Sequence, residues 1–332
     1  MNRLQISKIG LALVHTTIPM RKPGLIVFLF ICSISALNAQ TTSSKIFDAA
    51  KNNDLKEVKS LLEKGVNPNS ADEDGDHLLI YATLYSSIDC MKILIEKGAD
   101  INAKNNLDET ALMWSVHDIA KMKFLIDNGA DVNAKAKSGN TPLLIASIGH
   151  GKYDVVKLLI DKGADVSAVN NRKENALIRA SLFGDTTTVS LLLSKGLDLN
   201  ALSLDSTSAL VNAVLNANKQ VIFQLLDRGA DPDNTSFSGL TSLSFAVIFT
   251  DAETVKAILK KSKKVNSMDY DGNTVLMYAG YHEHDDVDMI QALLDKGADV
   301  NIKSKNGATA LSWASKKGNT ATVALLKKAG AK

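Results

Sequence analysis

The sequence is poor in the features that mark several classes of protein. Its 332 residues include only 2 Cys, 9 Phe, 6 Tyr and 2 Trp. No stretch after residue 39 is apolar for long enough to cross a membrane as a helix. The sequence also contains no Gly-rich phosphate loop, nucleophile elbow, metalloprotease helix or paired-cysteine motif. We therefore predict no enzyme activity and no cofactor. Because aromatic residues are so few, the positions that they occupy are informative.

Residues 1–39 contain no acidic residue and predict an export signal. From Met20, the segment MRKPGLIVFLFICSISALNAQ has a basic start, an apolar run over 25–31 and a short ALNA stretch before Gln40. This is the layout of a cleavable secretory signal peptide. We predict cleavage after Ala39, with Met20 as an alternative start of translation, and a periplasmic or secreted location.

Removal of this segment changes the charge and the cysteine content. Four of the 38 basic residues and none of the 36 acidic ones lie in it, so 34 basic and 36 acidic residues remain. A nearly neutral surface lacks the positive charge that nucleic-acid binding needs. Cys32 is removed with the segment, and Ile31 stands where a lipoprotein signal needs a small residue, so we expect no lipid anchor. Cys90 alone cannot form an intramolecular disulfide, and stability has to come from packing.

The strongest positive signal is an internal repeat with a period of roughly 33 residues. A turn phrase recurs as EKGADINAK (96–104), DNGADVNAK (127–135), DKGADVSAV (161–169), SKGLDLNAL (194–202), DRGADPDNT (227–235) and DKGADVNIK (295–303), with weaker copies at 63–71, 261–269 and 328–332. A second phrase recurs as HLLIYA (77–82), TALMWS (110–115), TPLLIA (141–146), NALIRA (175–180), SALVNA (208–213), TSLSFA (241–246), TVLMYA (274–279) and TALSWA (309–314). Each second phrase is followed by an apolar stretch with helical periodicity.

The repeated residue types predict a pair of helices in every unit. The Thr, Ser or Asn that opens most units can cap a first helix with its side-chain oxygen. A glycine such as Gly163 follows the amphipathic stretch VVKLLIDKG, where a helix end favours a left-handed residue. Small residues such as Ala146 let two antiparallel helices approach closely. Because no unit can bury its apolar face alone, the units have to stack into a solenoid.

These phrases resemble the ankyrin repeat, whose pattern is roughly G-x-T-P-L-x-x-A-A…V-V-x-L-L-L-x-x-G-A-D-V-N-A. The resemblance covers residues 46–332 as about nine units. It implies an all-α repeat solenoid of stacked helix-turn-helix repeats joined by β-hairpin-like loops. We assign residues 40–71 to an N-terminal capping repeat and residues 72–332 to eight repeats, the last of which is a C-terminal cap. The resemblance further implies protein–protein recognition through hairpin tips, first helices and a concave groove.

One position of the second phrase, two residues after its Leu, carries most of the notable side chains. Its members are Tyr81, Trp114, Ile145, Arg179, Asn212, Phe245, Tyr278 and Trp313. Five of the eight are aromatic, and both tryptophans are among them. We call this set the stripe. In ankyrin repeats this position lies on the first helix, toward the concave groove. The stripe either packs adjacent first helices together or forms a partner-binding surface, because aromatic and Arg side chains are enriched in interface hot spots.

Two irregular units have features of their own. The unit that opens at Thr110 is two residues short, and this shortening brings Ser115, His117 and Asp118 close together. Ser115 occupies the small packing position of the repeat, so we do not expect a nucleophile there. A second irregular unit carries the longer loop GYHEHDDVD (280–288).

His282, His284 and Asp286 of that longer loop are the only candidates for metal ligands. The other interpretation of the loop is a solvated insertion without a ligand.

Our main functional hypothesis is an exported, monomeric, non-enzymatic module with a protein partner. The alternative is a small-ligand or metal-binding accessory protein that uses the 280–288 loop.

Overall fold

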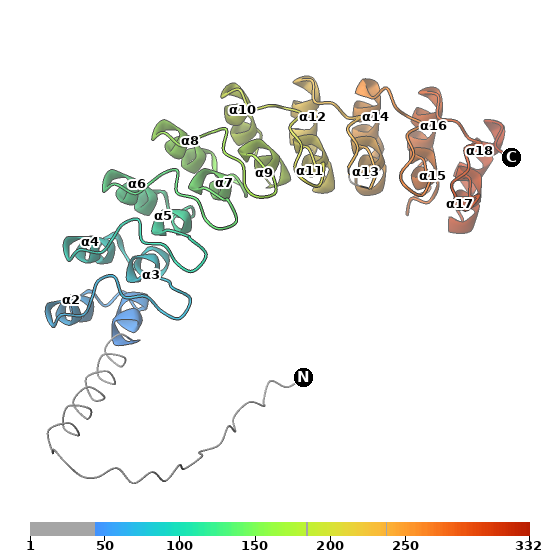
Figure 1. Ribbon diagram of the computed structural model, residues 1–332. Helices are drawn as coiled ribbons and strands as arrows, with labels where there is room; N and C mark the ends of the chain where they lie inside the picture. The colour runs from blue at the N-terminus through green and yellow to red at the C-terminus, as the bar shows by residue number, and fades with distance from the viewer. Residues whose placement is uncertain (1–43, 184, 237) are drawn as a thin grey trace, which may run out of the picture.

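The computed structural model describes residues 44–183, 185–236 and 238–332 and shows a curved stack of helix pairs (Figure 1). The predicted signal peptide, residues 1–39, lies outside the described residues. The stack begins with a helix over residues 44–51, which is followed by α2 (Leu55–Glu63). The all-α repeat solenoid expected from the sequence is confirmed.

The first helices of the pairs line the concave side of the arc (Figure 1). They are α3 (Leu78–Tyr85), α5 (Ala111–Trp114), α7 (Pro142–Ala146), α9 (Ala176–Phe183), α11 (Ala209–Leu215), α13 (Ser242–Phe249), α15 (Val275–Gly280) and α17 (Ala310–Lys317). The second helices form the outer, convex layer with α2. They are α4 (Ile88–Glu96), α6 (Ile119–Asp127), α8 (Tyr153–Asp161), α10 (Thr186–Ser194), α12 (Lys219–Asp227), α14 (Ala252–Lys261), α16 (Val287–Asp295) and α18 (Thr320–Lys328).

Side-chain caps start helices in both layers. At the inner helices, the hydroxyls of Thr141, Ser208, Thr241, Thr274 and Thr309 accept hydrogen bonds from backbone N–H groups of the first turn. The expected cap does not form at Thr110, whose buried hydroxyl has no partner. Most outer helices start with an aspartate cap, and Asp118 accepts from the N–H groups of Ala120 and Lys121. Capping of this kind satisfies donors that an isolated helix leaves unpaired.

One continuous core lies between the two layers. The outer helices are amphipathic: α8, for example, buries Val155, Val156 and Leu159 and turns its charged residues outward. Each inner helix packs against its neighbours along the stack, where the repeated small residue is almost fully buried, as at Ala82, Ala146, Ala180, Ala213 and Ala246. At Gly280 an added Cβ would lie 2.9 Å from the Ala310 carbonyl oxygen, so the backbones of α15 and α17 approach within a distance that excludes a side chain.

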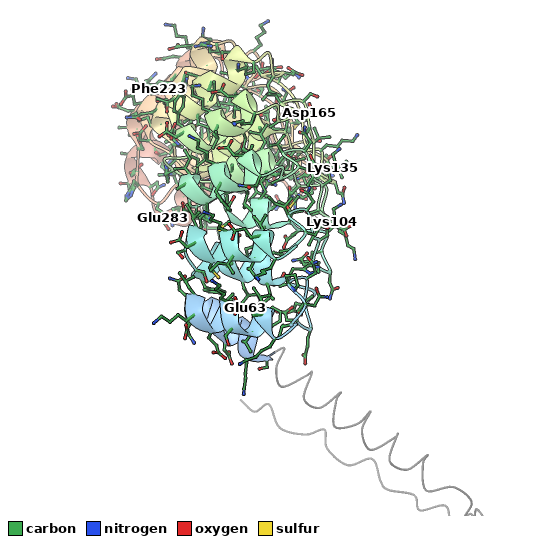
Figure 2. The ribbon with its side chains drawn as sticks, turned by 90° about the vertical axis from the view of Figure 1, so that its left-hand side faces the viewer. Glu63, Lys104, Lys135, Asp165, Phe223 and Glu283 are labelled. Carbon is green, nitrogen blue, oxygen red and sulfur yellow. The ribbon has the colours of Figure 1, made fainter. Side chains whose placement is uncertain are left out.

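Loops between the pairs project from one edge of the stack as hairpins. Figure 2 shows Lys104, Lys135 and Asp165 along this edge, while Glu283 of the 280–288 loop lies on the other side of the stack. Three antiparallel bridges, Ala71–His77, Thr235–Thr241 and Met268–Thr274, support the expected hairpin character. Within the described parts of the chain, no helix is both long enough and apolar enough to span a bilayer.

Asparagine side chains join successive hairpins. Asn133, for example, donates to the Gly163 carbonyl oxygen (3.0 Å) and accepts from the Asp165 N–H (2.7 Å). The same bridge, with both bonds, is made by Asn69, Asn102, Asn266 and Asn301. Each amide satisfies backbone groups of the following hairpin, so the bridges fix the register of neighbouring pairs.

Asn200 makes one of these two bonds, because it accepts from the Asp231 N–H (2.8 Å). At two further hairpins another residue stands in place of the asparagine. Ser167 replaces the asparagine, and its hydroxyl bonds Asp165 of its own hairpin at 2.6 Å. Asp233 replaces it where Ser262 stands in place of the turn glycine. The Asp233 carboxylate accepts from the Ser262 hydroxyl (2.5 Å) and from the Lys263 N–H (2.8 Å). The side chain of Asp233 therefore still bonds the next hairpin, whereas that of Ser167 bonds only its own hairpin.

Candidate binding groove

All eight stripe residues lie on the inner helices at one register, from α3 to α17. Seven of them are partly buried, and Trp114 is the most accessible at 37%. The structure therefore brings the predicted set together along the concave side, as a row of partly covered side chains. Their assignment as partner-binding residues stays a prediction.

The two polar members of the stripe bond the preceding helix. The Arg179 Nε donates to the Leu144 carbonyl oxygen (2.8 Å), and its guanidinium pairs with Glu174 (3.0 Å). Burial lowers the pKa of the Arg179 guanidinium, and the Glu174 carboxylate opposes that effect. The Asn212 amide donates to the Ile178 carbonyl oxygen (2.8 Å). Both side chains therefore connect adjacent inner helices through hydrogen bonds, as expected if the stripe packs these helices together.

The two tyrosines of the stripe are tied to aspartates of the hairpins. The Tyr81 hydroxyl donates to Asp72 (2.7 Å), and the Tyr278 hydroxyl donates to Asp269. The hydrogen bond to Asp72, together with burial, raises the pKa of Tyr81 to about 12. Burial, followed by the hydrogen bond to Asp269, raises the pKa of Tyr278 to about 12. Both hydroxyls are occupied, which leaves the ring faces and edges as the parts available to a partner.

Aromatic contacts concentrate at the two ends of the stripe. The ring of Tyr81 lies edge-on to Phe47, with centroids 4.8 Å apart, and 5.9 Å from Tyr85. At the other end Trp313 lies edge-on to Tyr278 (5.6 Å) and to Tyr281 (5.7 Å). Such pairs add to the energy of simple area burial. They place rigid, amphipathic ring surfaces at both ends of the groove.

A second row of apolar side chains, which the sequence reasoning missed, lies beside the stripe. These residues stand three or four positions after the stripe residues, on the same inner helices or one or two residues after their ends, and they are 37–51% exposed. We call them the groove rim: Leu84, Tyr85, Ile148, Phe183, Leu215, Phe249 and Tyr281. Residues three and four apart share a helix face, so this spacing would have identified them. More of their surface is exposed than that of most stripe residues.

The shortened unit interrupts the rim at α5. This helix ends at Trp114, so it has no second turn to cover the indole. Ser115, which follows, is 1% exposed, and its hydroxyl donates to the Leu112 carbonyl oxygen (2.7 Å). Asp118 caps the next helix. Ser115 and Asp118 therefore have structural roles, and the exposure of Trp114 follows from the two missing residues.

Two aspartates of the 280–288 loop bond the N-terminal ends of helices. Asp286 accepts from the Met289 N–H and caps α16 (3.0 Å). Asp285 accepts from the N–H groups of Ala321 and Thr322 at the start of α18 (2.7 and 2.9 Å). The rings of His282 and His284 lie 5.8 Å apart. Among the described residues, no three His, Cys, Asp or Glu side chains gather in a group that could hold a metal ion. The candidate ligands His282, His284 and Asp286 thus do not form such a group in the described residues.

Comparisons with known proteins agree with this architecture. Residues 46–136, 118–203, 210–304 and 243–332 match a family model described as ankyrin repeats in three copies. The chain is 39% identical over 72 residues to an ankyrin repeat-containing protein of Schizosaccharomyces pombe, across 22% of this chain and 35% of that protein. It is 38% identical over 58 residues to a putative ankyrin repeat protein of Escherichia coli, across 18% of this chain and 29% of that protein. The match thus spans about a third of the length of these relatives.

Proposed function

The chain belongs to the ankyrin-repeat family, and from that membership we propose that it is an exported, non-enzymatic module that binds a protein partner through its concave groove and hairpin tips. Ankyrin repeats are generally protein–protein interaction modules and are typically not enzymes. Solenoids of this kind present extended concave surfaces to their partners. We further propose that the chain acts as a monomer, which light scattering on the purified protein would check.

The groove rim is the observation that carries this proposal. Its seven large apolar side chains lie along the concave side, with a gap at α5, and keep 37–51% of their surface exposed. Single exposed apolar residues are common on proteins, but several of them gathered along one side of a solenoid mark an interaction surface. Aromatic side chains such as those of Tyr85 and Phe249 are enriched in protein interfaces.

Site-specific crosslinking tests the groove. A photo-crosslinking amino acid replaces Phe249 in the rim or, as a matched control, Lys92, whose side chain is 62% exposed on the outer helix α4. Each protein is expressed in its native host and irradiated. We expect one protein to be captured from position 249 and not from position 92. Equal capture from both positions would contradict the groove as the binding site.

A second measurement links capture to the rim chemistry. Replacement of Tyr85 with Ser is expected to weaken binding of the captured partner by roughly tenfold or more, because anchor aromatics typically contribute at least one factor of ten. Replacement of Lys92 with Ser should leave binding unchanged. An equal loss in the two variants would show that the rim has no special part.

Export is proposed from the composition of residues 1–39, and a reporter fusion tests it. Residues 1–39, or residues 20–39, are joined to an enzyme that is active only outside the cytoplasm. We expect activity from both fusions and a processed N-terminus that begins at Gln40. An intact, inactive fusion would show that the segment is not an export signal.

A further inference from the structure

The outer helix α10 differs in composition from the other helices of the outer layer. Its sequence TTTVSLLLS contains five Thr or Ser residues and no charged residue. Each of the other outer helices carries at least two charged side chains. The solvated face of an amphipathic helix is usually charged, so contact with water does not by itself explain a face made of hydroxyl groups.

These hydroxyl groups line an open hollow between α8, α10 and α12, which are neighbours in the outer layer (Figure 1). Its volume is about 740 Å³, within the range of roughly 300–1,000 Å³ that is typical of small-ligand sites. Among the residues that line it are Tyr153 of α8, Thr186, Ser190 and Leu191 of α10, Gln224 of α12, and Arg228 at the end of α12. The hollow lies on the convex side of the stack, away from the groove.

The Gln224 side chain fixes the hydrogen-bonding groups at one wall of the hollow. Its Nε2 donates to the Thr186 carbonyl oxygen (3.0 Å) and to the Ser190 hydroxyl oxygen. Only an N–H can donate to a carbonyl, so the first bond fixes the orientation of the amide. The Ser190 hydroxyl accepts from Gln224 and keeps its own proton for another acceptor. The Gln224 Oε1 is buried without a hydrogen-bond partner, which is unfavourable for a polar atom.

Further polar groups of the hollow also lack partners. Within the described part of the chain, the hydroxyls of Tyr153 and Thr186 form no hydrogen bond, and Arg228 belongs to no ion pair. Asp154 and Asp227, next in sequence to Tyr153 and Arg228, are exposed and carry the opposite charge to the guanidinium. The hollow is therefore rich in hydrogen-bonding groups without a strong net charge, which does not favour an anion as its ligand.

We propose that this hollow binds a neutral oligosaccharide. A sugar hydroxyl both donates and accepts hydrogen bonds, so it complements the hydroxyls of Thr186 and Ser190. A ligand hydroxyl that reaches the Gln224 Oε1 would supply the donor that this oxygen lacks. The Leu191 side chain and the Tyr153 ring offer apolar surface to the C–H groups of a sugar ring. This site is separate from the groove, so the inference does not depend on the proposed protein partner.

A ligand in the hollow would connect helix pairs that are weakly joined at their hairpins. Ser167, between α8 and α10, bonds only its own hairpin. An oligosaccharide that contacts both Tyr153 of α8 and Arg228 at the end of α12 spans this junction. Binding stabilises the state that binds. Saturation with the saccharide is therefore expected to raise the Tm and to slow hydrogen exchange in α8 and α10.

A glycan array tests the proposal. The labelled full chain is applied to immobilised oligosaccharides, both neutral ones and ones that contain uronic acids. We expect at least one neutral glycan to retain the protein. Isothermal titration calorimetry then gives the affinity for that glycan in solution. This affinity should change by less than about twofold when the salt concentration is raised tenfold, because screening weakens ionic contacts and leaves neutral hydrogen bonds largely unaffected.

Single variants assign the binding to the hollow. Arg228→Gln is expected to weaken the glycan by roughly tenfold, because hydrogen bonds from a charged donor are lost, and Ser190→Ala by roughly threefold. The matched control is Lys97→Gln, which removes a positive charge at the same C-terminal capping position of α4 and should leave the affinity unchanged. Arg228 and Lys97 are exposed, and thermal melts of each variant confirm that it is folded.

Several outcomes would overturn the proposal. They are the absence of glycan binding, retention by uronic-acid glycans alone, and an affinity that Arg228→Gln and Ser190→Ala leave unchanged. Glycan binding without slower hydrogen exchange in α8 and α10 would place the saccharide elsewhere on the molecule. The groove crosslinks are read independently, so either site can fail alone.

Discussion

Arg179 and Arg172 approach the same carboxylate, Glu174, from different environments. The side chain of Arg179 is 11% exposed and reaches the preceding inner helix, whereas that of Arg172 is 65% exposed at a hairpin tip. A buried charged group that loses its hydrogen bonds costs far more than an exposed ion pair. The same residue type therefore serves the fold at position 179 and the surface at position 172.

Truncation of Arg179 and of Arg172 should distinguish the structural role of the first from the surface position of the second. We expect Arg179→Ala to lower the free energy of unfolding by about 2–3 kcal/mol, because the Leu144 carbonyl and Glu174 both lose a charged partner. The matched Arg172→Ala should change it by less than about 0.5 kcal/mol. Urea unfolding midpoints of the three proteins give the comparison. Equal midpoints for both variants would contradict a structural role for Arg179.

At the scale of helices, aspartate caps make the stability of the outer helices depend on pH. Asp251 starts α14 by accepting from the Thr254 N–H (2.8 Å), and Lys219 of α12 lies 3.0 Å away. The hydrogen bond from the Thr254 N–H lowers the pKa of Asp251 below its usual 3.8. Burial opposes this shift, and the Thr254 hydroxyl and Lys219 add to it. A lowered pKa in the folded state contributes stability that is present above the ordinary pKa and lost as pH falls through the folded value.

Acid unfolding should therefore depend on this cap. Below about pH 4, the stability of the protein is expected to fall more steeply than that of Asp251→Asn, which keeps a capping oxygen but has no charge to lose. Thermal melts between about pH 6 and pH 2 measure the difference. Glu253→Gln removes the other carboxylate that faces Lys219 without removing a cap, and so isolates the part due to that ion pair. Parallel pH profiles for the protein and Asp251→Asn would refute the cap contribution.

Much of the helix pattern could be predicted from sequence because each helix is coded locally. Thr141 and Gly163 mark the start and the end of one helix pair, and the two residues missing after Thr110 shorten α5. The use of stripe side chains could not be predicted, since Arg179 bonds a carbonyl 35 residues earlier. The groove rim could have been predicted from the sequence, because its members follow stripe residues by one helical turn, as Phe249 follows Phe245.

At the scale of the whole molecule, stability is shared between helix pairs and the junctions that join them. Asparagine bridges join most junctions, but Ser167 bonds only its own hairpin. The junction between α8 and α10 therefore lacks two hydrogen bonds that Asn133 makes one pair earlier. Opening of the stack is expected to occur preferentially at this junction.

Restoration of the bridge should strengthen the stack. Ser167→Asn places an amide where it can donate to the Gly196 carbonyl oxygen and accept from the Asp198 N–H. We expect stability to rise by about 0.5–1 kcal/mol, since these bonds are exposed. Slower hydrogen exchange in α8 and α10 would show that the gain is local. The reverse change, Asn133→Ser, should cost a similar amount, and a stabilised Asn133→Ser protein would contradict the role of the bridge.

The positions of the two tryptophans have a consequence for spectroscopy. Trp114 lies uncovered at the shortened helix α5, and Trp313 lies among tyrosine rings on α17, many helices away along the same groove. Their indole emission should differ, because Trp114 is more exposed to water than Trp313. Replacement of either with Phe leaves a single tryptophan at a known place in the molecule. Quenching of each in turn would then report which end of the groove a ligand covers, without any added label.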